Sequence, residues 1–161
     1  LHLQKRLPVV YEMLGNIVRF HTSSVSENIR IHFTRDDTPL TAKVDRGQIN
    51  RVFTNLILNS IEAMPDGGDL RVIVRGDGAN IFVMFEDTGV GIPSETIDKI
   101  FTPYYTTKHG GTGLGLSIVK RILQDHGATI EAESTPGSGT RFVIIFKQII
   151  AAPGGGTDKD E

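Results

Sequence analysis

Four polar and glycine-rich blocks interrupt the amphipathic segments of this 161-residue chain in a fixed order. They are Asn55–Asn59, Asp87–Gly91, Thr106–Lys108 and Gly110–Leu116. Amide and carboxylate oxygens can coordinate a metal ion or accept a hydrogen bond from a nucleotide base. Glycine lets the backbone approach a ligand closely, and a lysine beside a helix start attracts phosphate. A fold that places these blocks around one cleft would contain the parts of a nucleotide site, so the pattern indicates a nucleotide-binding phosphotransfer domain.

The segments between the blocks have the periodicities of helices and strands. Apolar residues recur at helical spacing in some segments and alternate with polar residues in others. The predicted helices are residues 7–18, 45–64 and 113–126, with a short helical candidate at 94–101, and the predicted strands are residues 29–33, 40–44, 70–74, 81–85, 129–133 and 141–146. We therefore expect an α/β fold, a two-layer sandwich in which a mixed, largely antiparallel sheet packs on about three helices.

Local signals mark where these elements begin and end. Asp45 followed by Gln48 resembles a capping box at the start of the second helix, and Gly127 suits the position after the end of the third. Turn-forming residues at 36–39 separate the first two predicted strands, and those at 76–80 predict a hairpin. We expect residues 1–150 to form one domain and residues 151–161 to be a flexible C-terminal tail or linker.

Composition argues against several classes of protein. Lys and Arg number 17 against 19 Asp and Glu, so the chain lacks the basic excess of a nucleic-acid-binding domain. It contains no cysteine, which excludes disulfides and thiolate metal sites and fits a reducing compartment. No apolar run approaches the roughly 20 residues that span a bilayer. We expect a cytoplasmic fragment that is not inserted in a membrane, whether or not its parent protein is anchored there.

Asn55 and Asn59 lie four residues apart and therefore share one face of a predicted helix, on a stripe that continues at Glu62. Asn costs on the order of half a kcal/mol relative to Ala in a helix, so two on one face are unusual without a task. An amide oxygen suits Mg²⁺, which takes hard oxygen ligands and keeps several waters and phosphate oxygens. The alternative is a solvated polar face, because the stripe lies away from the apolar side of this helix.

Asp87 directly follows the apolar run 81–85, and a carboxylate at the end of a core strand has to find partners. The amino group of adenine is a suitable donor, and Gly89 and Gly91 would let the backbone approach a flat base. The alternative is a plain turn between a strand and a loop, because Asp-Thr-Gly is common in turns.

The block Gly110–Leu116 combines flexible glycines with the start of a predicted helix, whose N–H groups attract phosphate, and Lys108 lies just before it. The alternative is a flexible surface loop. The spacing is not that of a dinucleotide-binding fingerprint, because Ile118 occupies the third glycine position, and the chain contains no P-loop signature. His109 lies within the same loop, but the histidines include no pair with metal-ligand spacing.

In this order the blocks resemble those of the ATP-binding catalytic domain of sensor histidine kinases. This family belongs to the superfamily of gyrase, the Hsp90 chaperones and MutL, which share the Bergerat-type fold. The resemblance extends from about Leu7 to Phe146. Its parts are the N box at 55–63, the G1 box at 87–91, the F box at 100–108, the G2 box at 111–120 and a last box at 137–140. The style of the N and F boxes is similar to that of nitrogen-regulation-type kinases.

The resemblance implies that ATP and Mg²⁺ are the cofactors. Asn59 would hold Mg²⁺ with Asn55 beside it, and these two residues with Lys108 would form the catalytic set. Asp87 would read the adenine amino group directly and Thr140 would contact the base through water. The full set of implied ATP-binding residues is Asn55, Asn59, Ala63, Asp87, Gly89, Gly91, Ile92, Thr107, Lys108, Gly110, Gly111, Thr112, Gly113, Leu114, Gly115, Leu116 and Thr140.

The resemblance also implies a function and partners. The γ-phosphoryl group would pass to a histidine on a separate dimerisation domain of the same parent protein, and then to the receiver domain of a response regulator. Because the family dimerises through that other domain, this fragment would be monomeric in isolation. His2 does not match the family's acceptor motif, since Leu-Gln-Lys follows it.

Asn55 separates this reading from its main alternative, an ATPase that works as a conformational switch. Hydrolysing relatives carry Glu as general base at this position, and an amide cannot take a proton from water at neutral pH. Transfer to an outside acceptor is therefore favoured. A non-catalytic nucleotide-binding module and a serine kinase of the anti-sigma type remain as further alternatives.

Overall fold

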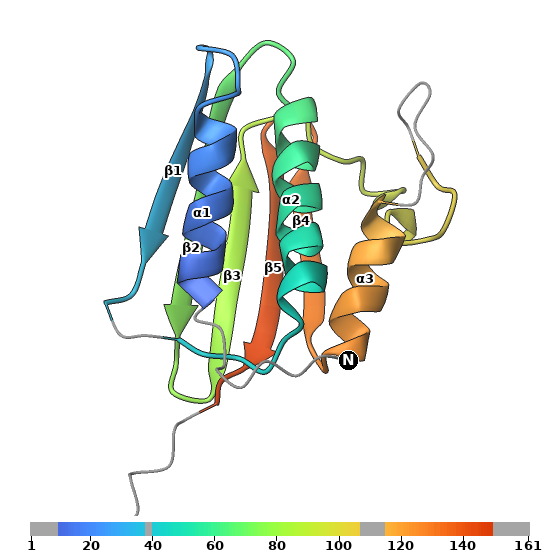
Figure 1. The fold of residues 1–161 in the computed structure, drawn as a ribbon. Helices are drawn as coiled ribbons and strands as arrows, with labels where there is room; N and C mark the ends of the chain where they lie inside the picture. The colour runs from blue at the N-terminus through green and yellow to red at the C-terminus, as the bar shows by residue number, and fades with distance from the viewer. Residues whose placement is uncertain (1–9, 38–39, 107–114, 150–161) are drawn as a thin grey trace, which may run out of the picture.

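The computed structural model describes residues 10–37, 40–106 and 115–149 (Figure 1). Three α-helices and five strands occur in this part of the chain. In chain order the elements are α1 (Val10–Thr22), β1 (Ile29–Arg35), α2 (Arg46–Glu62), β2 (Gly68–Gly76), β3 (Asn80–Asp87), the 3₁₀ turn η1 (Ile97–Lys99), α3 (Gly115–Asp125), β4 (Thr129–Thr135) and β5 (Gly139–Lys147). Figure 1 shows all three helices on the same face of the sheet, which gives two layers.

The sheet has the strand order β1-β2-β3-β5-β4. The β1–β2 pair is parallel, while the other three pairs are antiparallel. The predicted two-layer sandwich with a mixed, largely antiparallel sheet is thus confirmed. The β3–β5 register places Asp87 opposite Thr140, so the last residue of β3 and an early residue of β5 lie side by side.

The predicted strand at residues 40–44 is wrong. Leu40 and Ala42 are buried as the alternation predicts, but the segment forms only an isolated bridge at Thr41. Thr41 accepts a backbone hydrogen bond from Ile149 (2.9 Å), and its hydroxyl donates to the Ile149 carbonyl (2.9 Å). The strand that pairs with β1 is β2, in parallel. The alternation at residues 40–44 therefore reflects burial of one side of the segment, and it does not indicate a strand paired with β1.

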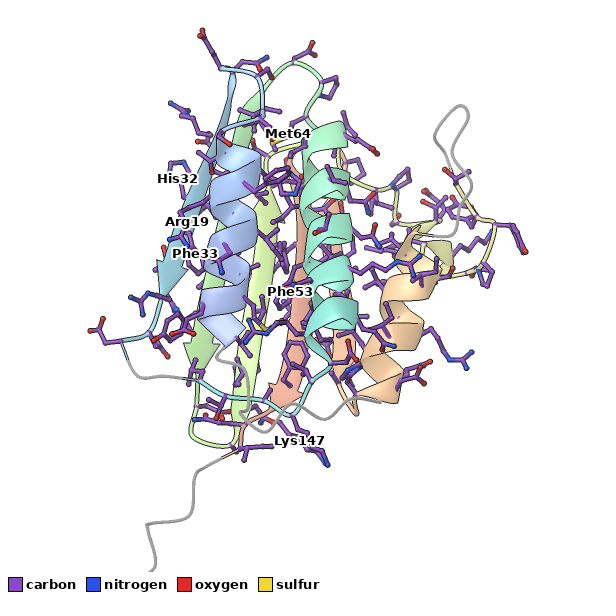
Figure 2. The ribbon with its side chains drawn as sticks, in the orientation of Figure 1. Arg19, His32, Phe33, Phe53, Met64 and Lys147 are labelled. Atoms are coloured by element: carbon purple, nitrogen blue, oxygen red, sulfur yellow. The ribbon has the colours of Figure 1, made fainter. Side chains whose placement is uncertain are left out.

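The core lies between the helices and the sheet. Phe53 of α2, labelled in Figure 2, packs against Phe85 of β3 and Phe146 of β5 with ring centroids 6.1 and 6.5 Å apart. The buried residues of α2 are Ile49, Val52, Phe53, Leu56, Ile57 and Ser60. This apolar stripe fixes the rotation of α2, and it therefore decides which residues of the helix face away from the sheet.

Polar contacts of Asp45 and His126 hold the helix ends. The Asp45 side chain accepts from the backbone N–H of Gln48 (2.9 Å), which confirms it as the N-cap of α2. The Asp45 N–H donates to His126 Nε2 (3.0 Å), so the proton of this neutral ring is on Nδ1, which donates to the Ile122 carbonyl (2.7 Å). Gly127 follows with φ +65°, as the sequence predicts for the end of α3. The start of α2 is thereby joined to the end of α3.

None of the helices in the described residues is long and apolar enough to cross a membrane.

Candidate functional site

A cleft of about 420 Å³ opens where α2, β3, β5 and the start of α3 meet the segment that follows β3. Its wall combines polar side chains with apolar ones. The lining residues are Asn59, Glu62, Ala63, Asp87, Val90, Gly91, Ile92, Pro93, Thr96, Ile100, Tyr105, Thr106, Gly115, Leu116, Thr140 and Phe142. The volume is within the range of small-molecule sites in proteins, and the mixture suits a ligand with a flat apolar part and polar groups.

Asp87 is the buried acceptor of the cleft, with a residue exposure of 7%. Its Oδ1 accepts from the backbone N–H groups of Gly89 (2.9 Å) and Thr140 (3.3 Å). Burial raises the pKa of Asp87, and the donors Gly89, Ser60 and Thr140 partly oppose the rise. The Ser60 hydroxyl opposes the rise in the pKa of Asp87, although it forms no well-aligned hydrogen bond within the described residues. Neither backbone bond goes to Oδ2, so this oxygen can accept from a donor on a ligand.

Thr140 lies beside Asp87 and is also buried. Its hydroxyl lies 2.9 Å from the hydroxyl of Ser134 on β4. Ser134 also donates to the Gly139 carbonyl (2.8 Å) and accepts from the Ile92 N–H (2.7 Å). One serine thus joins the cleft wall after β3 to the β4–β5 hairpin.

The glycines of the Asp87–Gly91 block are required by contacts within the protein. A Cβ at Gly89 would overlap the Ala63 carbonyl at the end of α2, and one at Gly91, where φ is +73°, would overlap the Thr135 carbonyl. Val90 between them donates to the Ala63 carbonyl (2.9 Å) and accepts from the Gly137 N–H (2.8 Å). The segment is therefore held between α2 and the β4–β5 turn, which is a physical reason for glycine that does not involve a ligand.

The apolar wall comes partly from β5 and from the segment around η1. Phe142 follows Thr140 by two residues, so it faces the same side of the sheet. The ring of Phe101 packs edge-on against Phe142, with centroids 6.3 Å apart. Tyr105 lines the cleft, whereas its neighbour Tyr104 is 78% exposed with φ +66°.

The structure brings together eight of the residues implied by the family resemblance. Asn59, Ala63, Asp87, Gly91, Ile92, Gly115, Leu116 and Thr140 all line the cleft. Asn55 lies one helical turn before Asn59 and does not line the cleft, and Gly89 lies behind it against Ala63. The implied residues Thr107, Lys108, Gly110, Gly111, Thr112, Gly113 and Leu114 lie outside the described residues.

Sequence reasoning missed Ser134 and Phe142. Phe142 could have been found, because strand alternation from Thr140 points to it. Ser134 carries no signal in the sequence alone, since its role depends on the pairing of β4 with β5, in which Ser134 lies opposite Thr140.

The described residues contain no group of three or more His, Cys, Asp or Glu side chains that could hold a metal ion. Asn59 and Glu62 nevertheless put an amide oxygen and a carboxylate on the cleft wall. This sparse set of hard oxygen donors does not fit an all-protein metal cage. It does fit Mg²⁺, which takes one or two protein oxygens and completes its octahedron with water and phosphate oxygens.

A buried carboxylate acceptor, an apolar wall and hard oxygen donors in one cleft of an α/β sandwich define a nucleotide-binding class of domain. Comparison with known families agrees with this class. The sequence model of the family described as "Histidine kinase-, DNA gyrase B-, and HSP90-like ATPase" matches residues 44–149. The chain belongs to this family. Membership of an ATPase family makes ATP the nucleotide of the domain.

Its relatives include sensor kinases and their catalytic domains. Sensor histidine kinase ZraS of Escherichia coli (strain K12) is 40% identical over 119 residues, which are 74% of this chain and 26% of that protein. The solved catalytic domain of histidine kinase ThkA is 30% identical with a TM-score of 0.80, covering 89% of this chain and 95% of that domain. ThkA in complex with the response regulator protein TrrA is 27% identical with a TM-score of 0.76, covering 89% of this chain and 42% of that one. The chain thus spans about a quarter of ZraS and most of the ThkA catalytic domain.

Proposed function

We propose that the cleft binds Mg²⁺-ATP and presents its γ-phosphoryl group to a histidine on a separate dimerisation domain, from which a response regulator receives it. The observation that carries this proposal is the buried Asp87 carboxylate in the same cleft as the Asn59 amide. The Asp87 carboxylate can accept a hydrogen bond from a base, and the Asn59 amide oxygen can coordinate a metal ion that is bound to the phosphates. The names of the relatives as sensor histidine kinases, and the ThkA complex with a response regulator, support the assignment of acceptor and partner.

The adenine end of the site would be built around Asp87. Its Oδ2 accepts from the adenine amino group, while Oδ1 stays bonded to the backbone N–H groups of Gly89 and Thr140. Ala63 and Ile92 pack on the faces of the base, and Thr140 contacts it through a water molecule. Because the carboxylate is held by two backbone donors before a ligand arrives, little ordering is left for the binding step.

The phosphate end would use the Asn face of α2. Asn59 would hold Mg²⁺, with Asn55 one turn behind, and Gly115 begins α3, whose N-terminal N–H groups favour phosphate. By the family resemblance, Lys108 and the backbone amides of residues 110–115 would contact the phosphates as well. When bound, Mg²⁺ neutralises charge on the β- and γ-phosphates and so favours attack on the γ-phosphorus.

Residues of this domain position ATP and exclude water, and the nucleophile comes from outside. A neutral imidazole attacks the γ-phosphorus through its lone pair while the P–O bond to the β-phosphate breaks and ADP leaves, so the attack requires no general base on this chain. Asn55 could not act as a base toward water, which disfavours ATP hydrolysis at the same site. Catalysis would then consist of positioning and charge neutralisation. The fragment itself would be a monomer, and it would act in the cytoplasm, where ATP is available.

The test uses a protein in which this chain is joined to its histidine-bearing dimerisation domain. Incubation with Mg²⁺ and γ-labelled ATP should give a phosphorylated protein whose label is lost in acid and kept in base, because phosphohistidine is acid-labile. An acid-stable label would indicate a serine kinase. Steady-state phosphate release without any phosphoprotein would indicate an ATPase, and ATP binding with neither product would indicate a non-catalytic module.

A further inference from the structure

We infer that Ser134 is a positioning residue that determines nucleobase specificity by fixing which way the Thr140 hydroxyl points its proton. This inference rests on the proposed function, because it assumes that the base lies against Asp87 and Thr140. Ser134 lies on β4, half-buried, and does not line the cleft. It would therefore act through Thr140 and would not touch the ligand.

A serine hydroxyl has one proton to donate and two lone pairs to accept with. The Ser134 proton goes to the Gly139 carbonyl, 2.8 Å away. One lone pair accepts from the Ile92 N–H at 2.7 Å. The remaining contact, 2.9 Å to Thr140 Oγ1, can then be made in only one sense, with Thr140 donating and Ser134 accepting. All three capacities of the Ser134 hydroxyl are used.

The consequence falls on the cleft. Thr140 lines it, and the only proton of its hydroxyl is committed to Ser134, so Thr140 can offer just lone pairs to a ligand or to a bridging water. Asp87 beside it is a carboxylate and also an acceptor. The Asp87 and Thr140 side chains at this end of the cleft can thus only accept hydrogen bonds from a ligand or from a bridging water. The 6-amino group of adenine can donate to Asp87 and to a lone pair of the bridging water that itself donates to Thr140, whereas the carbonyl of a 6-oxo purine sets an acceptor against both.

Removing the Ser134 hydroxyl would release the Thr140 proton. In Ser134→Ala, the Thr140 hydroxyl can rotate and donate its proton toward the cleft. A donor at this position does not suit the 6-amino group of adenine, whereas it provides a hydrogen bond for the carbonyl of a 6-oxo purine. Adenine should therefore lose affinity while the 6-oxo base loses less or gains. A role confined to holding the fold would weaken both nucleotides by the same factor.

The experiment measures the dissociation constants of ATP and inosine 5′-triphosphate by calorimetry with Mg²⁺, for the full chain and its variants. Wild type should prefer ATP. Ser134→Ala should reduce the ratio of the two affinities by roughly tenfold, the equivalent of about one hydrogen bond. Ser134→Thr keeps a hydroxyl and should restore the ratio. Ser138→Ala, in the exposed turn of the same hairpin, is the matched control and should leave it unchanged.

A second variant tests the route through Thr140. In a Thr140→Val background no hydroxyl remains to be oriented, so Ser134→Ala should no longer change the ratio. If Ser134→Ala does not fold, Ser134→Cys replaces it, since a thiol of similar size is a much weaker hydrogen-bonding group. Three results would overturn the inference: equal weakening of both nucleotides by Ser134→Ala (or by Ser134→Cys in its place), an unchanged ratio in that single variant, or a ratio that Ser134→Ala still changes in the Thr140→Val background. In each case ATP binding by wild type keeps the proposed function intact. A wild type that does not bind ATP overturns both.

Discussion

Asp87→Asn replaces the carboxylate that we propose to bind adenine by an amide of nearly the same shape. In the wild type Oδ1 accepts from the N–H groups of Gly89 and Thr140. The carbonyl oxygen of Asn can accept both bonds, so its NH₂ group would take the place of Oδ2 toward the cleft. The substitution should therefore preserve the fold and replace an acceptor by a donor at the position where we place the adenine amino group.

The loss of ATP affinity can be worked from these contacts. A hydrogen bond to a charged acceptor contributes about 1.5–3 kcal/mol, and a buried donor left facing another donor costs about 1–3 kcal/mol more. The smaller values together give about 2.5 kcal/mol, which is roughly sixtyfold in the dissociation constant. The same exchange should make a 6-oxo purine nucleotide a better ligand of the variant than of the wild type.

Stability of the ligand-free protein should change in the opposite direction. Burial raises the pKa of Asp87 above its ordinary value of 3.8. The unfolded chain therefore ionises at lower pH than the folded one, and folding loses stability as pH rises from 3.8 through the folded-state pKa. Asn has no charge to desolvate, so Asp87→Asn should unfold at a higher temperature than wild type at pH 7, with the advantage disappearing below pH 3.8.

Calorimetry with ATP and thermal unfolding across pH measure the two effects. Asp69→Asn is the control, because His32 and Arg30 lower the pKa of Asp69 and its side chain does not line the cleft. That variant should keep ATP affinity and lose stability at neutral pH. Unchanged ATP affinity in Asp87→Asn would refute the adenine assignment. A lower unfolding temperature at pH 7 would refute the desolvation argument, because the burial of a charge would then not dominate at this position.

Two further predictions concern the metal and the glycines. Asn59→Ala should remove the gain in ATP affinity that Mg²⁺ provides while leaving affinity in EDTA unchanged; calorimetry in both buffers checks this, and a persistent gain would exclude Asn59 as a ligand. Gly89→Ala should destabilise the protein by about 2 kcal/mol in urea unfolding, since its Cβ would overlap the Ala63 carbonyl. Gly47→Ala within α2, where a Cβ meets only ordinary contacts, should stabilise by about 0.5–1 kcal/mol, and equal effects at both glycines would contradict the packing argument.

Local sequence patterns predicted most elements and the β2–β3 hairpin, but not the pairing of strands that are far apart in the sequence. The helix that begins after Asp45 and the hairpin of β2 and β3 follow from a cap, a periodicity and a turn, all of which act over a few residues. The parallel pairing of β1 with β2 joins segments separated by α2, and no local signal encodes it. The error at residues 40–44 has this origin. Alternation there reports that Leu40 and Ala42 are buried, and burial does not require a ladder.

The candidate site shows the same division. Asp87, Asn59 and Thr140 could be named in advance because each carries a chemical group in a recognisable block, and all three line the cleft. Ser134 could not, because its function depends on which residues its single hydroxyl meets across β5 and the segment after β3. The glycines were predicted at the right positions with an incomplete reason, since the carbonyls of Ala63 and Thr135 exclude a side chain at Gly89 and Gly91 before any ligand is considered.

The two ends of the proposed site are positioned by different parts of the fold. Asp87 and Thr140 are cross-strand partners, and because side chains alternate along a strand, a slip of one residue between β3 and β5 would turn one of them out of the cleft. Gly139 fixes that register further, since a Cβ there would overlap the Asp87 carbonyl. Asn59 is placed instead by the packing of α2 on the sheet through Phe53. Base recognition therefore follows from backbone pairing and metal recognition from helix packing. Asp87→Asn and Asn59→Ala should for this reason impair nucleotide binding independently, with free-energy losses that add.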